Sequence, residues 1–466
     1  MKVLLIRHHD IGNINTRLPA SLNKMQGLYP PLGLLYIAAV LEQEGHKAQV
    51  LDSQALNLTT QETKDEIKKA KPALVGITAM TPTVKGAFEA ARLSKEVYPD
   101  VPTVLGGVQL SLYPEATVSN KYVDFGIAGE GEYVMADLAK SLQSGKKDFS
   151  KIKGLIYKED GKIRSTGFRI IENLDSLPFP ARHLVNTKDY SCVIAKDPMT
   201  TLMTSRGCPY RCGFCFKSPT DTKLRFRSPK SVVDEIEECV KKYKVKEIMF
   251  YDDTFTADRK HAMGISDEII KRGIKVSWEA PTRVNCVDQE LLKRMEHAGC
   301  VRLRLGVESG NNEILKIMRK GTNKEMVRKA FAMLRKTRIE TFAYFIIGYA
   351  HETEKTIQDT IDFAKELDSD WVMFTVATPL PQTPLFDEAV KLGVISKDYW
   401  LDFMTNKNPK RIKFFVKDAD QWAKKAYKEF YFRPHFVFKK LKKLNSIDTL
   451  KKYINGFRGI ALFEMK

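Results

Sequence analysis

The chain has 466 residues, 43% hydrophobic and 29% charged, a balance typical of soluble globular proteins with two or three domains. Its longest apolar runs, such as residues 32–41, are too short to cross a membrane, and residues 1–6 lack the charged start and cleavage site of a signal peptide. The net charge of +19 is concentrated, because residues 407–466 hold 17 Lys and Arg against five Asp and Glu. Seven cysteines, an odd number, favour a reducing cytoplasm over a disulfide-bonded secreted protein.

Residues 1–145 alternate short apolar runs with helical patterns, which predicts a doubly wound, Rossmann-like parallel sheet. The expected helices include residues 32–44 and 84–98, and the expected strands are residues 1–7, 48–52, 73–77, 101–105 and 123–128. Such sheets bind ligands beyond the carboxyl ends of their strands. The residues that follow those ends here include Thr78, Gly106, Gly107, Gly129 and Glu130. Glycines at these places let the backbone approach a bulky ligand closely.

Residues 146–195 are expected to connect two domains. Residues 154–157 and 162–165 flank Glu159-Asp160-Gly161, a sequence typical of a hairpin turn. Residues 177–180 (LPFP) predict an extended segment stiffened by proline. We assign no chemistry to this connector.

Residues 196–395 repeat a strand, a loop and a helix six times. The expected strands are residues 200–204, 247–251, 275–278, 302–307, 342–347 and 372–376. The expected helices are residues 232–243, 262–271, 289–297, 324–337 and 354–367. This pattern predicts a partial (β/α)6 barrel of the TIM type, in which the active site lies at the carboxyl ends of the strands.

The first barrel strand is followed by three cysteines, Cys208, Cys212 and Cys215, at a C-x3-C-x2-C spacing. Structural zinc normally takes four protein ligands, whereas the next cysteine along the chain is Cys239. Three close thiolates suit an iron–sulfur cluster better, and a 4Fe–4S cluster held by three of them leaves one iron open. The three thiols are therefore the expected metal ligands.

The cysteine loop resembles that of radical S-adenosylmethionine (SAM) enzymes. Residues 29–39 (YPPLGLLYIAA), 75–78 (VGIT) and 129–132 (GEGE) resemble the cobalamin-binding domain that precedes the barrel in the cobalamin-dependent branch of that family. Together the resemblance spans nearly the whole chain. It implies three cofactors: a 4Fe–4S cluster, SAM and cobalamin.

The same resemblance implies roles for residues at the strand ends. Phe214 is expected to pack on adenine, Asp252 to lie near the methionine amine, Glu308 to contact ribose or methionine, and Ile347, Gly348 and Pro379 to border adenine. Cobalamin is expected to contact Thr78, Gly106, Gly107, Gly129 and Glu130. Two features depart from relatives: no Asp-x-His-x-x-Gly motif supplies a histidine to cobalt, and residues 106–111 (GGVQLS) lack the Pro-His found after the glycines in many of them.

The chemistry implied by the resemblance is reductive cleavage of SAM to a 5′-deoxyadenosyl radical, which removes a hydrogen from an unactivated carbon. Methylation of that carbon from cobalamin is the leading expectation, and oxidative ring closure, as in anaerobic porphyrin cyclases, is the alternative. Either reaction needs an external one-electron reductant of the flavodoxin or ferredoxin type.

Two other classes compete with this interpretation. RNA-modifying methylthiotransferases carry a second cluster on three N-terminal cysteines, but no cysteine precedes Cys192 here, so we do not expect nucleic acid as a partner. A non-catalytic sensor of cobalamin or SAM would not need an intact cysteine trio.

Residues 396–466 predict a basic, helical C-terminal region. Trp422, Tyr427, Phe430, Tyr431 and Phe432 interleave with lysines, and Phe436, Phe438, Leu441, Leu444 and Tyr453 continue the pattern. Such helices suit peripheral binding to an anionic membrane and hence an apolar or lipid substrate. The alternative is a helical lid that packs its aromatic side chains on the barrel.

Overall fold

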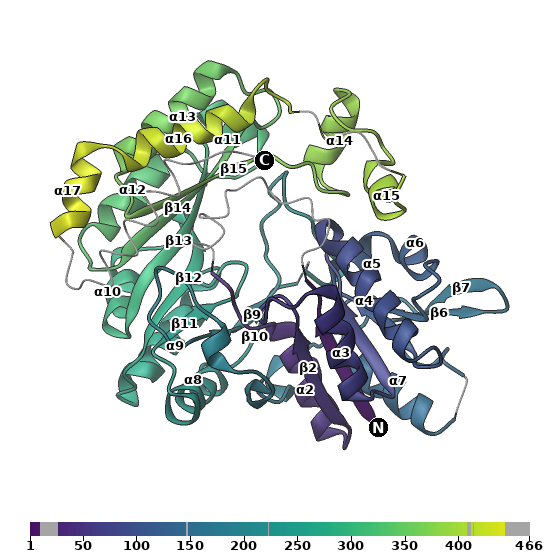
Figure 1. Cartoon of the computed structure of the whole chain (residues 1–466). Helices are drawn as coiled ribbons and strands as arrows, with labels where there is room; N and C mark the ends of the chain where they lie inside the picture. The colour runs from purple at the N-terminus through teal and green to yellow at the C-terminus, as the bar shows by residue number, and fades with distance from the viewer. Residues whose placement is uncertain (10–26, 146–147, 222, 408–411, 413, 443–466) are drawn as a thin grey trace.

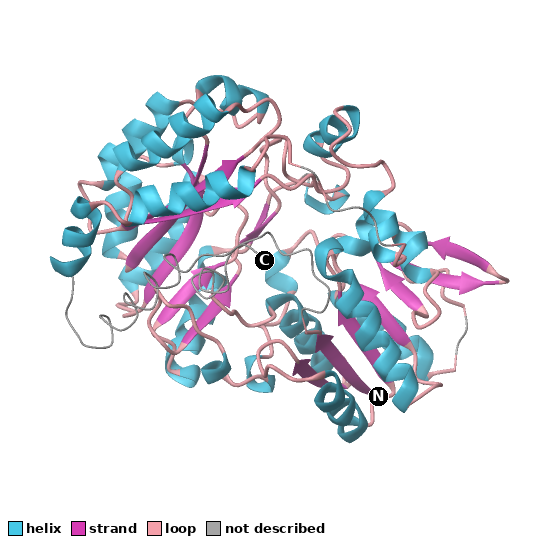
Figure 2. Ribbon diagram, turned by 45° about the horizontal axis from the view of Figure 1, so that its top comes forward, coloured by secondary structure: helices cyan, strands magenta, loops and turns pink. Residues whose placement is uncertain are grey.

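The chain folds around two large β-sheets flanked by helices, the first mostly parallel and the second wholly parallel (Figures 1 and 2). The computed structural model describes residues 1–9, 27–145, 148–221, 223–407, 412 and 414–442. Short 3₁₀ helices connect some of the elements: η1 (Thr81–Thr83), η2 (Leu174–Ser176), η3 (Arg182–Leu184), η4 (Thr187–Asp189), η5 (Pro219–Asp221) and η6 (Val284–Cys286).

The first sheet has the strand order β2-β1-β3-β4-β5-β6-β7, with β1 to β5 parallel. Its strands are β1 (Lys2–Arg7), β2 (Lys47–Asp52), β3 (Leu74–Thr78), β4 (Thr103–Gly106), β5 (Phe125–Ile127), β6 (Leu155–Glu159) and β7 (Lys162–Ser165). Its helices are α2 (Leu32–Gln43), α3 (Thr60–Ala70), α4 (Val84–Val97), α5 (Val108–Leu112), α6 (Pro114–Val118) and α7 (Glu132–Gln143).

Alternate residues of β1 build two separate cores. Val3 and Leu5 pack with α2 and α7 on one face of the sheet, whereas Leu4 and Ile6 pack with α3 and α4 on the other. Side chains of a strand point alternately to the two faces, so a sheet covered on both sides needs a continuously apolar strand. The doubly wound arrangement predicted from the sequence is confirmed.

The predicted hairpin in the connector forms as β6 and β7. Strand β6 pairs antiparallel with β5, with Phe125 opposite Tyr157, and β7 pairs with β6. The first sheet therefore continues beyond residue 145 into the segment that we expected only to connect two domains.

The second sheet has the strand order β15-β14-β13-β12-β11-β8, and all its pairs are parallel. Its strands are β8 (Met199–Leu202), β11 (Glu247–Phe250), β12 (Ser277–Arg283), β13 (Cys300–Glu308), β14 (Glu340–Ile347) and β15 (Trp371–Val376). The helices after them are α8 (Pro229–Tyr243), α9 (Arg259–Lys271), α10 (Gln289–His297), α11 (Asn312–Ile317), α12 (Lys324–Leu334) and α13 (Glu354–Leu367). Six strands in sequential order match the predicted partial barrel, and in the described residues β15 and β8 remain its two edges.

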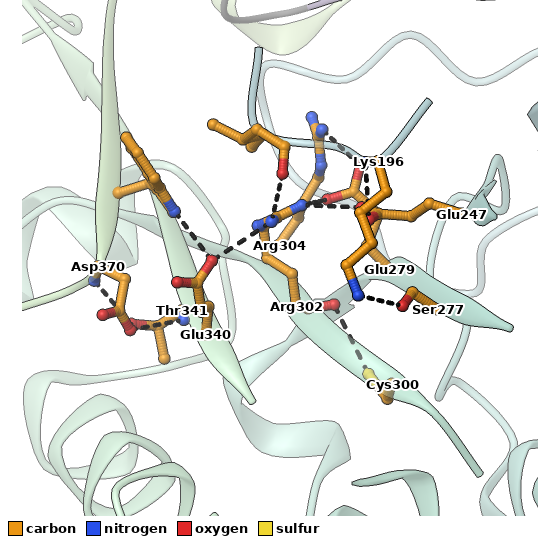
Figure 3. Close-up of polar contacts among 12 residues, drawn as sticks. Lys196, Glu247, Ser277, Glu279, Cys300, Arg302, Arg304, Glu340, Thr341 and Asp370 are labelled. Atoms are coloured by element: carbon orange, nitrogen blue, oxygen red, sulfur yellow. Dashed lines mark hydrogen bonds and ion pairs between the residues drawn. The ribbon is translucent and has the colours of Figure 1, made fainter. Parts of the chain in front are cut away.

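A buried ionic network fills the amino-terminal half of this sheet (Figure 3). Arg302 lies 2.8 Å from Glu279 and 3.3 Å from both Glu247 and Glu340, and Arg304 lies 2.7 Å from Glu279. Buried charges are tolerated where each is paired and hydrogen-bonded. The network occupies the end of the strands opposite to the cysteine loop.

The C-terminal helices are α14 (Pro384–Lys391), α15 (Tyr399–Met404), α16 (Ala419–Tyr431) and α17 (Pro434–Lys442). Tyr427, Phe430, Tyr431 and Phe436 are buried in the same core as the barrel helices. For α16 and the start of α17, the structure therefore favours the packed lid over an aromatic stripe free to enter a membrane. Residues 443–466, which include Leu444 and Tyr453, lie outside the described residues.

Candidate active site

The cysteine loop, of which the structure describes residues 207–221, 223 and 224, is closed at its base by a short antiparallel pair. Strand β9 (Ser205–Arg206) pairs with β10 (Arg225–Phe226), so Arg206 lies opposite Arg225. The loop thus leaves the end of β8 and returns to the same place before α8 begins. A loop tied at its base loses less conformational freedom when it binds a ligand.

Backbone contacts fix the middle of this loop. The Gly213 N–H donates to the Met318 carbonyl (2.8 Å), and the Gly213 carbonyl accepts from the Leu385 N–H (2.9 Å). Lys217 Nζ donates to the Cys208 carbonyl (3.2 Å). The loop is therefore held between the turn after α11 and the start of α14.

The three thiols of the loop are all unbridged. Cys212 is buried, Cys208 is half-buried and Cys215 is exposed. Thr254 Oγ1 lies 3.9 Å from Cys208 Sγ. Among the described residues, no three His, Cys, Asp or Glu side chains are placed to hold a single metal ion. A four-iron cluster binds each thiolate at a different iron, so its ligands need not share one ion position.

Phe214 and Glu308, two residues predicted for SAM, meet through a lysine. Lys320 Nζ donates to Glu308 Oε1 (2.7 Å) and lies 5.8 Å from the centre of the Phe214 ring. Glu308 ends β13 with a φ of 71°, a backbone conformation that costs energy in a residue other than glycine. Its carboxylate is buried, so the strand end presents a fixed ion pair beside the cysteine loop.

Asp252 has a structural role that the sequence did not indicate. Its carboxylate accepts hydrogen bonds from the Thr204 N–H (2.7 Å), the Thr204 hydroxyl and the Ser205 N–H (3.3 Å). Burial raises the pKa of Asp252 to about 6 against the effect of these hydrogen bonds. Asp252 ties the end of β11 to the start of the cysteine loop, whereas its neighbour Asp253 is exposed.

Ile347, Gly348 and Pro379 lie where the barrel meets the C-terminal helices. Ile347 is fully buried, and a Cβ on Gly348 would lie 2.7 Å from the Ala419 Cβ at the start of α16. The Pro379 carbonyl accepts a hydrogen bond from Trp400 Nε1 (2.9 Å). The glycine is thus required for packing on α16, in addition to any contact with adenine.

At the carboxyl ends of β3 and β4 the backbone is close-packed, and apolar side chains are exposed. Gly107 has a φ of 104°, and a Cβ there would lie 2.6 Å from the Ala79 carbonyl oxygen. Met80 is 56% exposed and Val108 is 38% exposed. Thr78 and Gly106 pair beside them. Large apolar side chains left in water at a ligand-binding edge fit the face of a large ring.

Glu130, which we expect to contact cobalamin, also has protein partners in the structure. Its carboxylate accepts from Arg225 Nη1 and Nη2 (2.8 and 2.9 Å), from Arg206 Nη1 (2.9 Å) and from the Ile171 N–H (2.5 Å). A Cβ on Gly129 would lie 2.8 Å from the Arg169 carbonyl oxygen. Gly129 and Glu130 therefore lie at the contact between the first sheet and the base of the cysteine loop, and their contact with cobalamin stays a prediction.

The carboxyl edges of the two sheets face each other. The rings of Tyr29, which follows β1 in the chain, and Tyr251, at the end of β11, are 6.0 Å apart. A second contact joins the loop after β15 to α5, where Gln382 Nε2 donates to the Leu112 carbonyl (3.3 Å). With the pairing of Glu130 and Arg206, these contacts bring the loops after both sets of strands together.

Sequence reasoning missed Arg206, Arg225 and Lys320. Arg206 and Arg225 are paired with each other at the base of the cysteine loop, and a basic residue on each side of the three cysteines is a signal that could have been used. Lys320 lies in a turn whose position depends on tertiary packing, so no local pattern indicates it.

Comparisons with known proteins agree with this architecture. Residues 202–364 match the Radical SAM superfamily, and residues 20–139 match the B12 binding domain. An uncharacterized methyltransferase of Pyrococcus horikoshii, PH0819, is 35% identical over 414 residues, which cover 88% of this chain and 89% of the relative. The chain belongs to the cobalamin-binding radical SAM enzymes.

Two further relatives of this family show its range. The anaerobic magnesium-protoporphyrin IX monomethyl ester cyclase of Rubrivivax gelatinosus is 32% identical over 373 residues, or 78% of this chain and 67% of the cyclase. The radical SAM methyltransferase TsrM from Kitasatospora setae, solved with cobalamin and a [4Fe-4S] cluster, is 18% identical and superimposes with a TM-score of 0.75 over 99% of both chains. At that identity the likeness to TsrM establishes the shared fold.

As a cobalamin-binding radical SAM enzyme, the protein uses a 4Fe–4S cluster, SAM, cobalamin, a reductant and a small-molecule substrate. Its residues fit these groups: three free thiols lie on an anchored loop, and exposed apolar side chains lie at the edge of the first sheet. No described helix is both long and apolar enough to cross a bilayer.

Proposed function

We propose that the enzyme methylates an unactivated carbon of an apolar substrate. The observation that carries this proposal is that the carboxyl ends of the strands in the two sheets face each other. A radical formed at the second sheet must meet the methyl donor held at the first. When bound, the cluster and SAM supply the radical and cobalamin supplies the methyl group.

We assign the cluster to Cys208, Cys212 and Cys215. The support is their spacing, their free thiols and the backbone anchors at Gly213. The barrel, residues 196–395, then holds SAM near Phe214 and Glu308, with Asp253 exposed for the amine and Asp252 setting the loop position.

We assign cobalamin to the first domain, residues 1–145, with contacts at Thr78, Gly106 and Gly107. Met80 and Val108 extend this surface with apolar side chains. No part of this assignment needs a histidine below the cobalt: His8 is buried, and its Nδ1 lies 2.9 Å from the carbonyl oxygen of His9.

An apolar substrate is favoured by the residues between the edges. Tyr251 is 53% exposed at the end of β11, and its ring lies 6.0 Å from that of Tyr29. Aromatic and apolar surface at an active-site edge binds apolar molecules by removing that surface from water.

Lipid is the class of apolar substrate that we favour, because residues 396–466 are strongly basic and an anionic membrane attracts such a region. The buried positions of Phe430 and Phe436 mean that this attraction rests on charge, not on those rings. Co-sedimentation with anionic and neutral vesicles tests it: binding to anionic vesicles that is lost in salt is expected, and equal absence of binding to both refutes it.

The test of methyl transfer uses SAM with a trideuterated methyl group. Reconstituted enzyme, cobalamin and a reductant are incubated anaerobically with lipid extracts, and products are analysed by mass. A product that gains one trideuteromethyl group in place of hydrogen supports the proposal. Deoxyadenosine formed with a product that lacks deuterium contradicts it.

Ring closure is the second candidate, because a relative 32% identical is named as a cyclase. The same experiment separates the two reactions. Oxidative ring closure removes hydrogen from the substrate and adds no deuterated methyl group.

A further inference from the structure

Arg283 contacts one sulfur of the cysteine loop directly. It is the last residue of β12, its side chain is buried, and its Nη1 donates to Cys212 Sγ at 3.3 Å. The two residues are 71 positions apart in the sequence, so no local sequence pattern predicts their contact. The contact is made by the barrel, which brings the end of β12 under the loop.

The guanidinium of Arg283 is held in one orientation by further contacts. Nη2 donates to the Lys320 carbonyl, and Nε donates to Asn285 Oδ1 (3.2 Å). The guanidinium carbon lies 3.9 Å from the centre of the Tyr210 ring, itself part of the cysteine loop. Each nitrogen therefore has its own acceptor, and the plane of the group is fixed by the ring.

We propose that Arg283 is a positioning residue that donates a hydrogen bond to the Cys212 ligand and raises the reduction potential of the cluster. This inference rests on the proposed assignment of the cluster to the three cysteines. Reduction adds a negative charge to the cluster, and a nearby cation with a hydrogen bond to a ligand sulfur stabilises the reduced form more than the oxidised form. Cluster potentials are known to depend on hydrogen bonds to the sulfurs and on solvent exposure.

A purely structural role makes a different prediction. If Arg283 only packs between Tyr210 and the Lys320 turn, its removal changes cluster content and stability but leaves the potential of the bound cluster alone. The potential therefore separates the two roles, and a graded series of substitutions sharpens the answer.

The experiment is an anaerobic redox titration of reconstituted enzyme, followed by EPR, with iron content measured in parallel. The series is Arg283→Lys, which keeps the charge, Arg283→Gln, which keeps a donor, and Arg283→Met, which keeps neither. The matched control is Arg328→Gln on the exposed face of α12, where Arg328 pairs with Glu325 and Glu366. It removes one positive charge from the same barrel, far from the cysteine loop in the chain.

We expect the ratio of reduced to oxidised cluster at a fixed solution potential to fall by about tenfold in Arg283→Met, which is about 59 mV for one electron. Among the Arg283 variants, this ratio should fall least in Arg283→Lys. In Arg328→Gln it should equal the wild-type ratio. A wild-type potential in Arg283→Met or Arg283→Gln with full iron content overturns the inference. So does loss of iron in all three variants, since that result assigns Arg283 a structural role.

These outcomes differ from failure of the proposed function. If wild-type protein binds no cluster, or if its EPR signal does not respond to SAM, the assignment of the three cysteines is wrong. If wild type binds the cluster and responds to SAM but the Arg283 series keeps its potential, only the role of Arg283 is wrong.

Discussion

The hydroxyl of Tyr427 lies 3.0 Å from both the backbone nitrogen and the backbone oxygen of Phe374. Tyr431 makes the same pair of contacts with Val372, at 3.0 and 2.8 Å. Tyr427 and Tyr431 are four residues apart on the helix, a rise of about 6 Å. Phe374 and Val372 are two residues apart on the strand, a span of about 6.6 Å. The spacing of the two hydroxyls therefore matches the spacing of the backbone groups that they contact. Helix α16 thus pairs the free edge of β15 and protects it from another strand.

Tyr427→Phe tests this edge pairing. The change leaves a buried N–H and a buried carbonyl of Phe374 unpaired, so we expect a loss of about 1–3 kcal/mol in the free energy of unfolding. Urea denaturation measures it. The control is Tyr122→Phe, which keeps its ring contact with Lys121 and should change stability by less than about 0.5 kcal/mol. Equal effects of the two changes would argue against edge pairing.

The pairing of Glu130 with Arg206 and Arg225 should make stability depend on pH. Burial raises the pKa of Glu130, but the Arg225 hydrogen bonds and the Arg206 charge lower it more, so the pKa falls below its usual value. As the pH falls below about 4.3, the glutamate is protonated in the unfolded chain first. The contribution of the ion pairs to the free energy of unfolding is therefore complete above that pH and is lost as the pH falls through the lowered pKa of the folded state.

Glu130→Gln should cost about 3 kcal/mol at neutral pH, because it leaves Arg225 buried without its countercharge, and it should flatten the acid side of the stability profile. The control is Glu172→Gln, which breaks an exposed pair with Lys223 and should leave stability nearly unchanged, because solvent screens that pair. An unchanged acid profile in Glu130→Gln would show that the pair does not control stability there.

Gly107→Ala tests the cobalamin edge. The new Cβ would meet the Ala79 carbonyl, and φ is positive, so the ends of β3 and β4 must move apart. We expect cobalamin affinity to fall at least about tenfold, or about 1.4 kcal/mol, with cluster content unchanged. Gly161→Ala in the β6–β7 turn has a positive φ but open space around the Cβ, and it should bind cobalamin normally.

Cobalamin should bind without a protein nitrogen on cobalt. We expect the EPR spectrum of the bound Co(II) form to be the same in wild type and in His8→Ala/His9→Ala. Nitrogen hyperfine structure that is present in wild type and lost in the double variant would show that one of these histidines is a ligand.

The elements of the fold were largely predictable because they depend on local periodicity. The six strands of the second sheet appear within a few residues of their predicted positions, and residues 289–297 and 354–367 are helical as expected. The cysteine loop was predictable for the same reason, since three ligand types at short spacing are visible in the sequence itself.

The partners of individual side chains were not predictable. Asp252 and Glu130 are both acidic residues at strand ends. The sequence pattern cannot show that Asp252 already accepts hydrogen bonds from backbone amides, or that Glu130 pairs with two arginines. Gly348 follows a strand end as a ligand-binding glycine would, yet its missing Cβ makes room for Ala419. The partner of each of these residues depends on which segment, distant in the sequence, packs against it. Local sequence patterns do not encode that information.

Reductive cleavage of SAM by the three cysteines is the most direct test of the account. Reconstituted wild type and Cys208→Ala/Cys212→Ala/Cys215→Ala are given SAM and a strong one-electron reductant without oxygen, and 5′-deoxyadenosine and bound iron are measured. The control is Cys239→Ala, which changes a cysteine buried in the barrel core. We predict a cluster and deoxyadenosine in wild type and in the control, and neither in the triple variant. Deoxyadenosine formed at the wild-type rate by the triple variant would contradict the account.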